Sequence, residues 1–145
     1  MPNDMNLFLV EDDDLDAEIL GRALCKIGAS EPFVRAKDGQ EALEILFNDT
    51  SSSELARPFT ILLDINMPRM NGLEFLKALR GTDEIKDAHV VDFTTSESKK
   101  DIGIAYRNNV AGYIIKPNSS AELQEVLKSL RAFLSNCERP EMFKH

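Results

Sequence analysis

The middle of the chain reads Thr60-Ile61-Leu62-Leu63-Asp64-Ile65-Asn66-Met67-Pro68. A β-favouring, mostly apolar run ends at an aspartate, and the Asn and Pro that follow are typical of a turn. This pattern predicts a buried strand over 60–63 that carries Asp64 at its carboxyl end. A simple turn residue is the alternative interpretation of Asp64.

Four more runs of this kind occur, each followed by a longer segment with helical period. The predicted strands are Leu7 to Val10, Phe33 to Ala36, Val90 to Phe93 and Tyr113 to Ile115. Alternating strands and helices predict an α/β protein, with βα units around a parallel sheet and each strand short enough to be buried. The first helix carries Leu15, Ile19, Leu20, Ala23, Leu24 and Ile27, and the last carries Leu123, Val126, Leu127, Leu130, Phe133 and Leu134. Both helices are therefore predicted to pack one face on the sheet.

Hydrogen-bond acceptors mark the starts of the helices. Asp38, Asn71, Ser98 and Ser119 each precede an acidic residue by three positions, the pattern of an N-terminal cap.

The polar stretch 48–58 is predicted to be a surface loop. We expect one domain with a core from about residue 6 to residue 136, and a tail, 137–145, that is too short to be an output domain.

Composition excludes several classes of protein. The 145 residues carry a formal net charge of −8, which disfavours nucleic acids and anionic membranes as partners. The sequence contains no secretory start and no apolar run of membrane-spanning length, so we expect a cytoplasmic protein. The cysteines and histidines are isolated in the sequence, which argues against a disulfide framework or a zinc site.

Polar residues follow four of the predicted strands. In a doubly wound sheet, ligands bind beyond the carboxyl ends of the strands, so these residues should meet at one edge. They are Glu11 and Asp12 after the first strand, Asp64 after the third, Thr94 and Thr95 after the fourth, and Lys116 after the fifth. Carboxylates at this density repel one another unless a cation lies among them, and Mg²⁺ prefers carboxylate, water and phosphate oxygens. The set predicts a magnesium site in which Asp64 takes a phosphoryl group, Lys116 neutralises charge and Thr94 hydrogen-bonds a phosphoryl oxygen.

Simpler interpretations exist for each of these residues. The acidic run 11–14 could be a charge cluster at a helix start, Thr94 an ordinary strand end and Lys116 a solvated lysine. The combination with Asp64 and Lys116 favours a site role for Glu11 and Asp12, whereas Asp13 and Asp14 are predicted to be caps.

Asp92 departs from the apolar pattern of the fourth predicted strand. By the alternation of a strand, it shares a face with Val90 and Thr94, which predicts that its side chain is buried. Because a buried unpaired carboxylate is costly, an arginine partner, a bound proton or a locally exposed edge would each relieve it.

Four blocks of the sequence resemble the receiver domains of bacterial two-component response regulators. They are Leu9-Val10-Glu11-Asp12, Leu62-Leu63-Asp64-Ile65-Asn66-Met67-Pro68, Thr94-Thr95-Ser96 and Tyr113-Ile114-Ile115-Lys116-Pro117. The resemblance covers about residues 6–136, and the spacing between the blocks is also similar. It implies a flavodoxin-like (βα)5 fold, in which a five-stranded parallel sheet is doubly wound in the strand order 2-1-3-4-5.

The resemblance also implies roles for the site residues. Asp64 would be the phosphoacceptor, and Lys116 would pair with Asp64 and then with the phosphoryl group. Mg²⁺ would be held directly by Asp12, through water by Glu11, by an oxygen of Asp64 and by the backbone carbonyl of Asn66. Thr94 and Tyr113 would act as the switch. The chain would catalyse only its own phosphorylation and dephosphorylation, so we do not expect it to be an enzyme for other substrates.

The expected phosphoryl donor is a histidine kinase or a histidine phosphotransfer protein. The long loop before the third strand, the Thr94-Thr95-Ser96 run and the long last helix are similar to single-domain regulators that serve bacterial phytochrome kinases. Without an output domain, the chain would signal through its own surface. An apolar stripe at Leu130, Phe133 and Leu134 predicts a homodimer through the helix after Ser98, the strand at 113–115 and the last helix.

Two other functions fit part of the pattern. A phosphohydrolase similar to the haloacid dehalogenases also uses a nucleophilic aspartate after a strand together with Mg²⁺. That family needs a second aspartate two residues later, where this chain has Asn66. A receiver-like interaction module that no longer takes phosphate is the third candidate, but such modules usually lack one or more of the matched residues.

Overall fold

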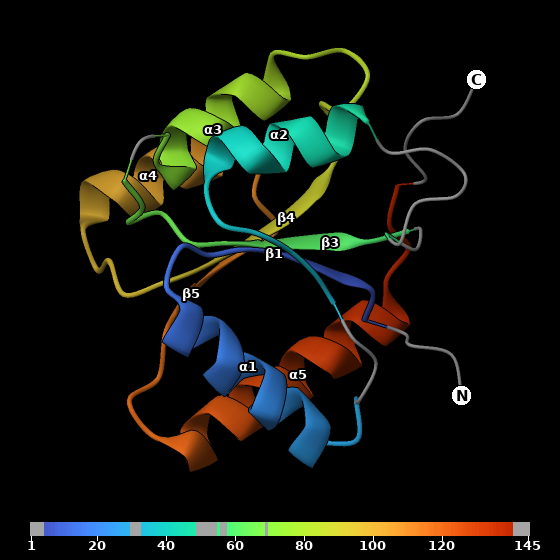
Figure 1. Cartoon of the computed structure of the whole chain (residues 1–145), viewed down its shortest axis with the longest axis vertical. Helices are drawn as coiled ribbons and strands as arrows, with labels where there is room; N and C mark the ends of the chain where they lie inside the picture. Colours follow the sequence, from blue (N-terminus) through green and yellow to red (C-terminus); the bar gives the residue numbers. More distant parts are fainter. Residues whose placement is uncertain (1–4, 30–32, 49–54, 56–57, 69, 141–145) are drawn as a thin grey trace.

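A computed structural model of the chain describes residues 5–29, 33–48, 55, 58–68 and 70–140, and in this part strands and helices alternate (Figure 1). The strands are β1 (Leu7–Val10), β2 (Val34–Ala36), β3 (Thr60–Leu63), β4 (His89–Thr94) and β5 (Gly112–Ile115). The helices are α1 (Asp14–Lys26), α2 (Gly39–Phe47), α3 (Gly72–Arg80), α4 (Lys99–Arg107) and α5 (Ser120–Asn136). None of the helices in the described residues is long and apolar enough to cross a membrane.

The five strands form one parallel sheet in the order β2-β1-β3-β4-β5. Helices α1 and α5 cover one face, and α2, α3 and α4 cover the other (Figure 1). The predicted α/β fold with the strand order 2-1-3-4-5 is therefore confirmed. The order reverses between β1 and β3, so this is where a doubly wound sheet leaves a crevice beyond its strand ends.

Each face of the sheet has its own apolar core, because successive side chains of a strand point to opposite faces. In β1, Phe8 and Val10 pack toward α2, α3 and α4, whereas Leu7 and Leu9 pack toward α1 and α5. All four are buried, as a central strand covered on both sides requires.

Four predicted helix starts are confirmed. The side chains of Asp38, Asn71, Ser98 and Ser119 each accept a hydrogen bond from the backbone N–H three residues later. The same bond makes Asp13 the cap of α1. Asp14, predicted to be a cap, is instead the first residue of the helix, and its carboxylate accepts a hydrogen bond from Arg35.

Other predictions need correction. The side strands β2 and β5 are partly exposed because they lie at the edges of the sheet, so the prediction that each strand is buried is wrong for them. Phe33 precedes β2 and is not part of it. In α1, Leu15 is 62% exposed and Ile19 is 41% exposed, since this side of the helix faces away from the sheet.

The apolar stripe at the end of α5 covers the protein's own sheet. Leu130 and Leu134 are buried, and only Phe133 is exposed, with its ring stacked on His89. The stripe is therefore much weaker support for a partner surface than the sequence pattern indicated.

Most of the predicted surface loop at 48–58, and residues 141–145 of the predicted tail, lie outside the described residues.

Candidate functional site

Three predicted site residues extend the sheet by one residue beyond its strands. The backbone N–H groups of Glu11, Asp64 and Lys116 each donate to a carbonyl group of the neighbouring strand, 2.8 to 3.0 Å away. These bonds hold the base of each side chain at the carboxyl edge of the sheet. Residues from the two ends of the sequence are thus fixed beside Asp64.

Gly72 allows α3 to begin directly against the end of β3. A Cβ atom at this position would collide with the backbone carbonyl of Asp64 and would lie 2.6 Å from Cα of Ile65. The Gly72 N–H also donates to the Ile65 carbonyl at 3.0 Å, which closes the turn after Asp64. Only glycine leaves room for this approach. Sequence reasoning did not identify Gly72, although its place directly after the cap Asn71 was a signal.

Glu11, Asp12 and Asp64 form an acidic cluster in which one carboxylate oxygen of each lies within 4.8 Å of the others. Glu11 and Asp64 are buried. Burial raises the pKa of Glu11 to about 7; the hydrogen bond from Lys116 opposes this shift, and the charge on Asp64 adds to it. Converging carboxylate oxygens suit a hard divalent cation, so the residues present fit the predicted metal.

Lys116 lies among three carboxylates. Its Nζ is 2.6 Å from Oε1 of Glu11, 3.2 Å from Oδ2 of Asp16 and 3.7 Å from Oδ2 of Asp64. Burial acts against its charge, but the contacts with Glu11, Asp64 and Asp16 outweigh burial and raise the pKa of Lys116. The expected pairing with Asp64 is present at the longest of the three distances, and Glu11 is the nearest partner. Asp16 is a site residue that sequence reasoning missed.

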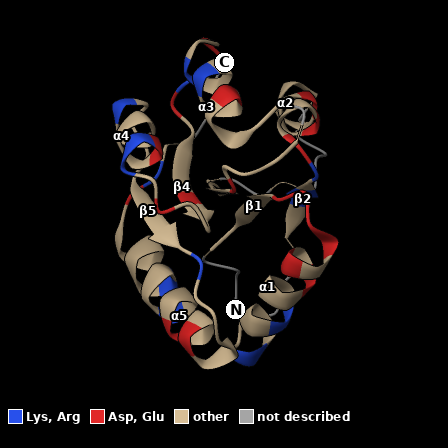
Figure 2. Ribbon diagram, turned by 90° about the vertical axis from the view of Figure 1, so that its left-hand side faces the viewer, with Lys and Arg blue, Asp and Glu red and all other residues tan. Residues whose placement is uncertain are grey.

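Arg35 of β2 supports the acidic loop from outside. Its Nε and Nη2 donate to the backbone carbonyl of Glu11 at 3.0 and 2.8 Å, and its Nη1 donates to Asp14. In Figure 2 the start of α1 is coloured red, in keeping with its acidic residues Asp14 and Asp16, of which Asp14 is bonded to Arg35. Sequence reasoning also missed this arginine, because its partners follow a different strand.

Asn66 closes the other side of the Asp64 carboxylate. Its backbone N–H donates to Oδ1 of Asp64 at 3.2 Å, and its side-chain amide donates to the Thr95 hydroxyl at 3.4 Å. One oxygen of Asp64 therefore meets an N–H group, and the other faces Lys116. The predicted use of the Asn66 carbonyl as a metal ligand stays a prediction.

Thr94 and Tyr113 are joined through Ser96. The buried Thr94 hydroxyl accepts a hydrogen bond from the Ser96 N–H at 3.3 Å, and the Tyr113 hydroxyl donates to the Ser96 carbonyl at 3.0 Å. The half-buried Tyr113 ring packs against the core under α2, α3 and α4, and burial raises its pKa. The loop that leads to α4 is thus bonded to both predicted switch residues.

Asp92 is buried with 0% exposure, opposite Leu63 of β3 and Tyr113 of β5. Within the described residues, neither of its carboxylate oxygens has a hydrogen-bond partner. Burial and then the charge on Asp64 raise its pKa to about 7, whereas the charge on Arg80 lowers it. The Arg80 guanidinium itself donates to backbone carbonyls at 2.7 to 3.0 Å. Of the three alternatives, an exposed edge is wrong and a bound proton fits; Arg80 acts on Asp92 through its charge but forms no hydrogen bond with it in the part of the chain that the structure describes.

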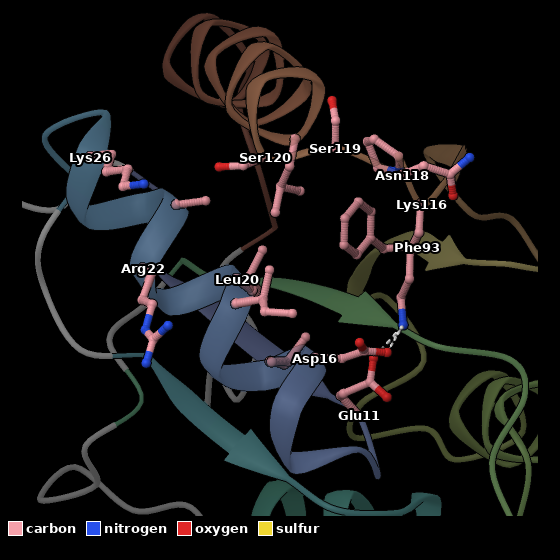
Figure 3. A pocket seen from close by; sticks show the side chains of 15 residues that line it. Glu11, Asp16, Leu20, Arg22, Lys26, Phe93, Lys116, Asn118, Ser119 and Ser120 are labelled. Atoms are coloured by element: carbon pink, nitrogen blue, oxygen red, sulfur yellow. Dashed lines mark hydrogen bonds and ion pairs between the residues drawn. The ribbon is translucent and has the colours of Figure 1, made fainter.

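A pocket of about 500 Å³ opens beside the acidic cluster, between α1 and the start of α5 (Figure 3). Glu11 and Lys116 belong to its wall, together with Asp16 and Arg22 of α1 and Ser119 before α5. The Lys116 ammonium can therefore be approached from solvent along this side of the sheet.

Comparison with known proteins agrees with this geometry. The family model for the response regulator receiver domain matches residues 7–128. The probable methanogenesis regulatory protein FilR2 of Methanothrix harundinacea is 30% identical over 128 residues, which cover 88% of this chain and 81% of FilR2. The response regulator Rcp1 of Synechocystis sp. is 27% identical over 127 residues, which cover 88% of this chain and 86% of Rcp1.

Solved structures give the same result. The crystal structure of the phosphorylated cyanobacterial phytochrome response regulator RcpA matches with a TM-score of 0.80 at 32% identity, over 93% of this chain and 97% of RcpA. The Mn²⁺-bound form of Rcp1 matches with a TM-score of 0.77 at 26% identity, over 92% of this chain and 97% of Rcp1.

Proposed function

Because this chain belongs to the response regulator receiver domain family, we propose that it accepts a phosphoryl group on Asp64. Receiver domains take part in two-component signalling, in which they receive phosphoryl groups from histidine kinases. The observation that supports Asp64 is its place after β3, the central strand. The acids that follow β1 lie on one side of it, and Thr94, the last residue of β4, and Lys116, which follows β5, lie on the other.

The proposed reaction is an in-line transfer between two protein side chains. An oxygen of Asp64 forms a bond to phosphorus while the bond from phosphorus to the donor's imidazole nitrogen breaks and that nitrogen keeps the electron pair. Lys116 is close enough to donate to a phosphoryl oxygen. Glu11, Asp12, Asp64 and the Asn66 carbonyl would hold Mg²⁺, whose charge supplies neutralisation of the phosphoryl oxygens. The chemistry is confined to this chain's own phosphorylation and dephosphorylation.

The metal ligands can be separated from their acidic neighbours by substitution. We expect Asp12→Ala to weaken Mg²⁺ binding about tenfold or more, because it removes a carboxylate of the cluster. Asp13→Ala, which removes the same charge one residue away, should change the affinity by less than about threefold, since Asp13 caps α1. A titration of each folded variant with Mg²⁺ measures the difference. Equal losses in the two variants would contradict the assignment of Asp12.

The proposed donor is a histidine kinase, or a histidine phosphotransfer protein that stands between kinase and regulator. RcpA is a phytochrome response regulator, and its similarity to this chain supports a kinase of the bacterial phytochrome class.

A homodimer through α4, β5 and α5 also stays a proposal. Its support is reduced to Tyr106, Ile115 and Phe133, which are exposed on these three elements.

The two rival functions are distinguished by one experiment. The full chain is incubated with a small acyl phosphate, with and without Mg²⁺, and the intact protein is weighed by mass spectrometry. Magnesium-dependent labelling is expected for a phosphoacceptor, and absence of labelling would favour the interaction module. Continued release of phosphate from an external phosphate ester would favour the phosphohydrolase, although Asn66 stands where that family needs an aspartate.

We further propose that Thr94 and Tyr113 carry the phosphorylation state to α4. Phosphorylation replaces the carboxylate charge of about −1 at Asp64 with about −2 on the acyl phosphate, and it adds acceptor oxygens to which the Thr94 hydroxyl can donate. That hydroxyl now accepts a hydrogen bond from Ser96, whose carbonyl also binds Tyr113, so movement of Thr94 disturbs both bonds. The available energy is about 1 to 3 kcal/mol, enough to shift populations within one fold.

Substitution of Thr94 tests this route. We expect Thr94→Ala to bind beryllofluoride, a phosphoryl mimic, but to lose most of the NMR chemical-shift changes at Tyr113 and along α4. The matched control is Thr95→Ala, which removes the neighbouring exposed hydroxyl and should keep these changes. A full set of shift changes in Thr94→Ala with the mimic bound would show that the signal takes another path.

A further inference from the structure

Asp16 differs from the other two carboxylates around Lys116. Glu11 and Asp64 belong to the acidic cluster that fits a cation, whereas Asp16 lies in the first turn of α1 and is outside that cluster. Figure 3 shows the Asp16 and Glu11 side chains pointing toward the Lys116 ammonium from the α1 side of the pocket, with both contacts drawn. Asp16 therefore holds the ammonium on the side of the pocket, 3.2 Å away, while Asp64 is 3.7 Å away.

In this arrangement, the ion pair of Lys116 with Asp16 competes with the contact that Lys116 would make to a phosphoryl group on Asp64. The ammonium has three donors and must direct at least one to a phosphoryl oxygen on Asp64. A cation in the acidic cluster would neutralise charge on Glu11 and Asp64, which leaves Asp16 as the carboxylate that still attracts the ammonium at full strength. The Lys116 side chain is only 13% exposed, so water does not screen this attraction completely.

We propose that Asp16 is a positioning residue that competes with the phosphorylated Asp64 for the Lys116 ammonium, and thereby weakens the phosphorylated state. The inference rests on the proposed function, because it assigns the residue that sets how strongly Lys116 is available to the phosphoryl group. A helix-start acid that only stabilises the dipole of α1 would have no such effect.

Beryllofluoride affinity in the presence of Mg²⁺ tests the proposal on the full chain. We expect Asp16→Asn to bind the mimic about three- to fivefold more tightly, since it removes one partly exposed ion pair with Lys116. Asp14→Asn is the matched control. It removes the same charge from the same helix turn, but Asp14 contacts Arg35 and not Lys116. Asp14→Asn should leave the affinity within about twofold. Asp16→Glu, which keeps the charge, should return the affinity to the parental value.

A second readout reports on Lys116 itself. The NMR signals of the Lys116 side-chain Cε and Nζ should move in Asp16→Asn without the mimic and stay unchanged in Asp14→Asn. Equal beryllofluoride affinities in Asp16→Asn and the parent, or weaker binding in Asp16→Asn, would overturn the inference and leave the proposed function intact. A parent protein that fails to bind the mimic at all would overturn both, because the proposed phosphoacceptor site would then be wrong.

Discussion

We expect the rate at which a small acyl phosphate labels the protein to fall at least about a thousandfold in Asp64→Asn. The amide that replaces the carboxylate cannot act as the nucleophile. The substitution keeps the size of the side chain. Its amide oxygen can still accept the hydrogen bond from the Asn66 N–H, so the turn after β3 should persist. Mass spectrometry of the intact protein measures the label, and circular dichroism confirms that the variant is folded.

Glu11→Gln is the matched control for this loss. It also removes a buried carboxylate next to Lys116, but not the proposed acceptor. Labelling should be slower in Glu11→Gln, and peptide mapping should still find the phosphoryl group on Asp64. An Asp64→Asn protein that is labelled to the parental extent, with a product that resists hydroxylamine, would place the acceptor elsewhere and contradict the assignment.

Local chemistry explains which parts of the fold could be predicted from sequence. A strand buried on both faces has to be apolar throughout, so β1 and β3 appear in the sequence with the bounds that the structure gives them. A helix cap joins a side chain to a backbone N–H three residues away, so the cap of α3 at Asn71 needs no knowledge of the rest of the chain. The site residues Glu11 and Asp64 also follow directly from strand ends.

Features that depend on distant neighbours could not be predicted in the same way. The apolar period of α1 includes Leu15 and Ile19, and only the position of the sheet decides that they face solvent. Asp16 looks like any acid in a first helix turn until β5 brings Lys116 beside it. The need for glycine at position 72 likewise arises from the path of the backbone at Asp64.

Asp92 was identified from sequence as an exception to the apolar pattern of its strand. Its surroundings are expected to lower the free energy of unfolding by an amount that can be measured. Its pKa rises from 3.8 to about 7, first through burial and then through the charge on Asp64, against the opposing charge on Arg80. Below pH 3.8 the carboxyl group holds its proton in the folded and in the unfolded chain, and ionisation costs nothing. As the pH rises toward about 7, the folded chain keeps the proton that the unfolded chain loses, so the free energy of unfolding falls with pH. Above about pH 7 the loss is complete.

We therefore expect Asp92→Asn to be more stable than the parent, by an amount that grows by about 2 to 3 kcal/mol between pH 5 and pH 8, at about 1.4 kcal/mol for each pKa unit. Urea unfolding of both proteins at each pH, without divalent cations, measures this difference. The raised pKa of Glu11 adds to the pH dependence of both proteins equally, so it cancels in the comparison.

Two further variants separate the charge of Asp92 from its polarity. Asp83→Asn removes a charge from a side chain that is 92% exposed, and it serves as the control for a change of net charge at the surface. Asp92→Val also removes the buried polar atoms, so it should exceed Asp92→Asn in stability at both pH values. A difference between Asp92→Asn and the parent that is constant from pH 5 to pH 8 would contradict the bound proton. Thr94 lies in β4, two residues after Asp92. If the predicted loss of stability is measured, the strand that leads to the proposed switch is destabilised by a carboxyl group whose ionisation responds to the charge on Asp64.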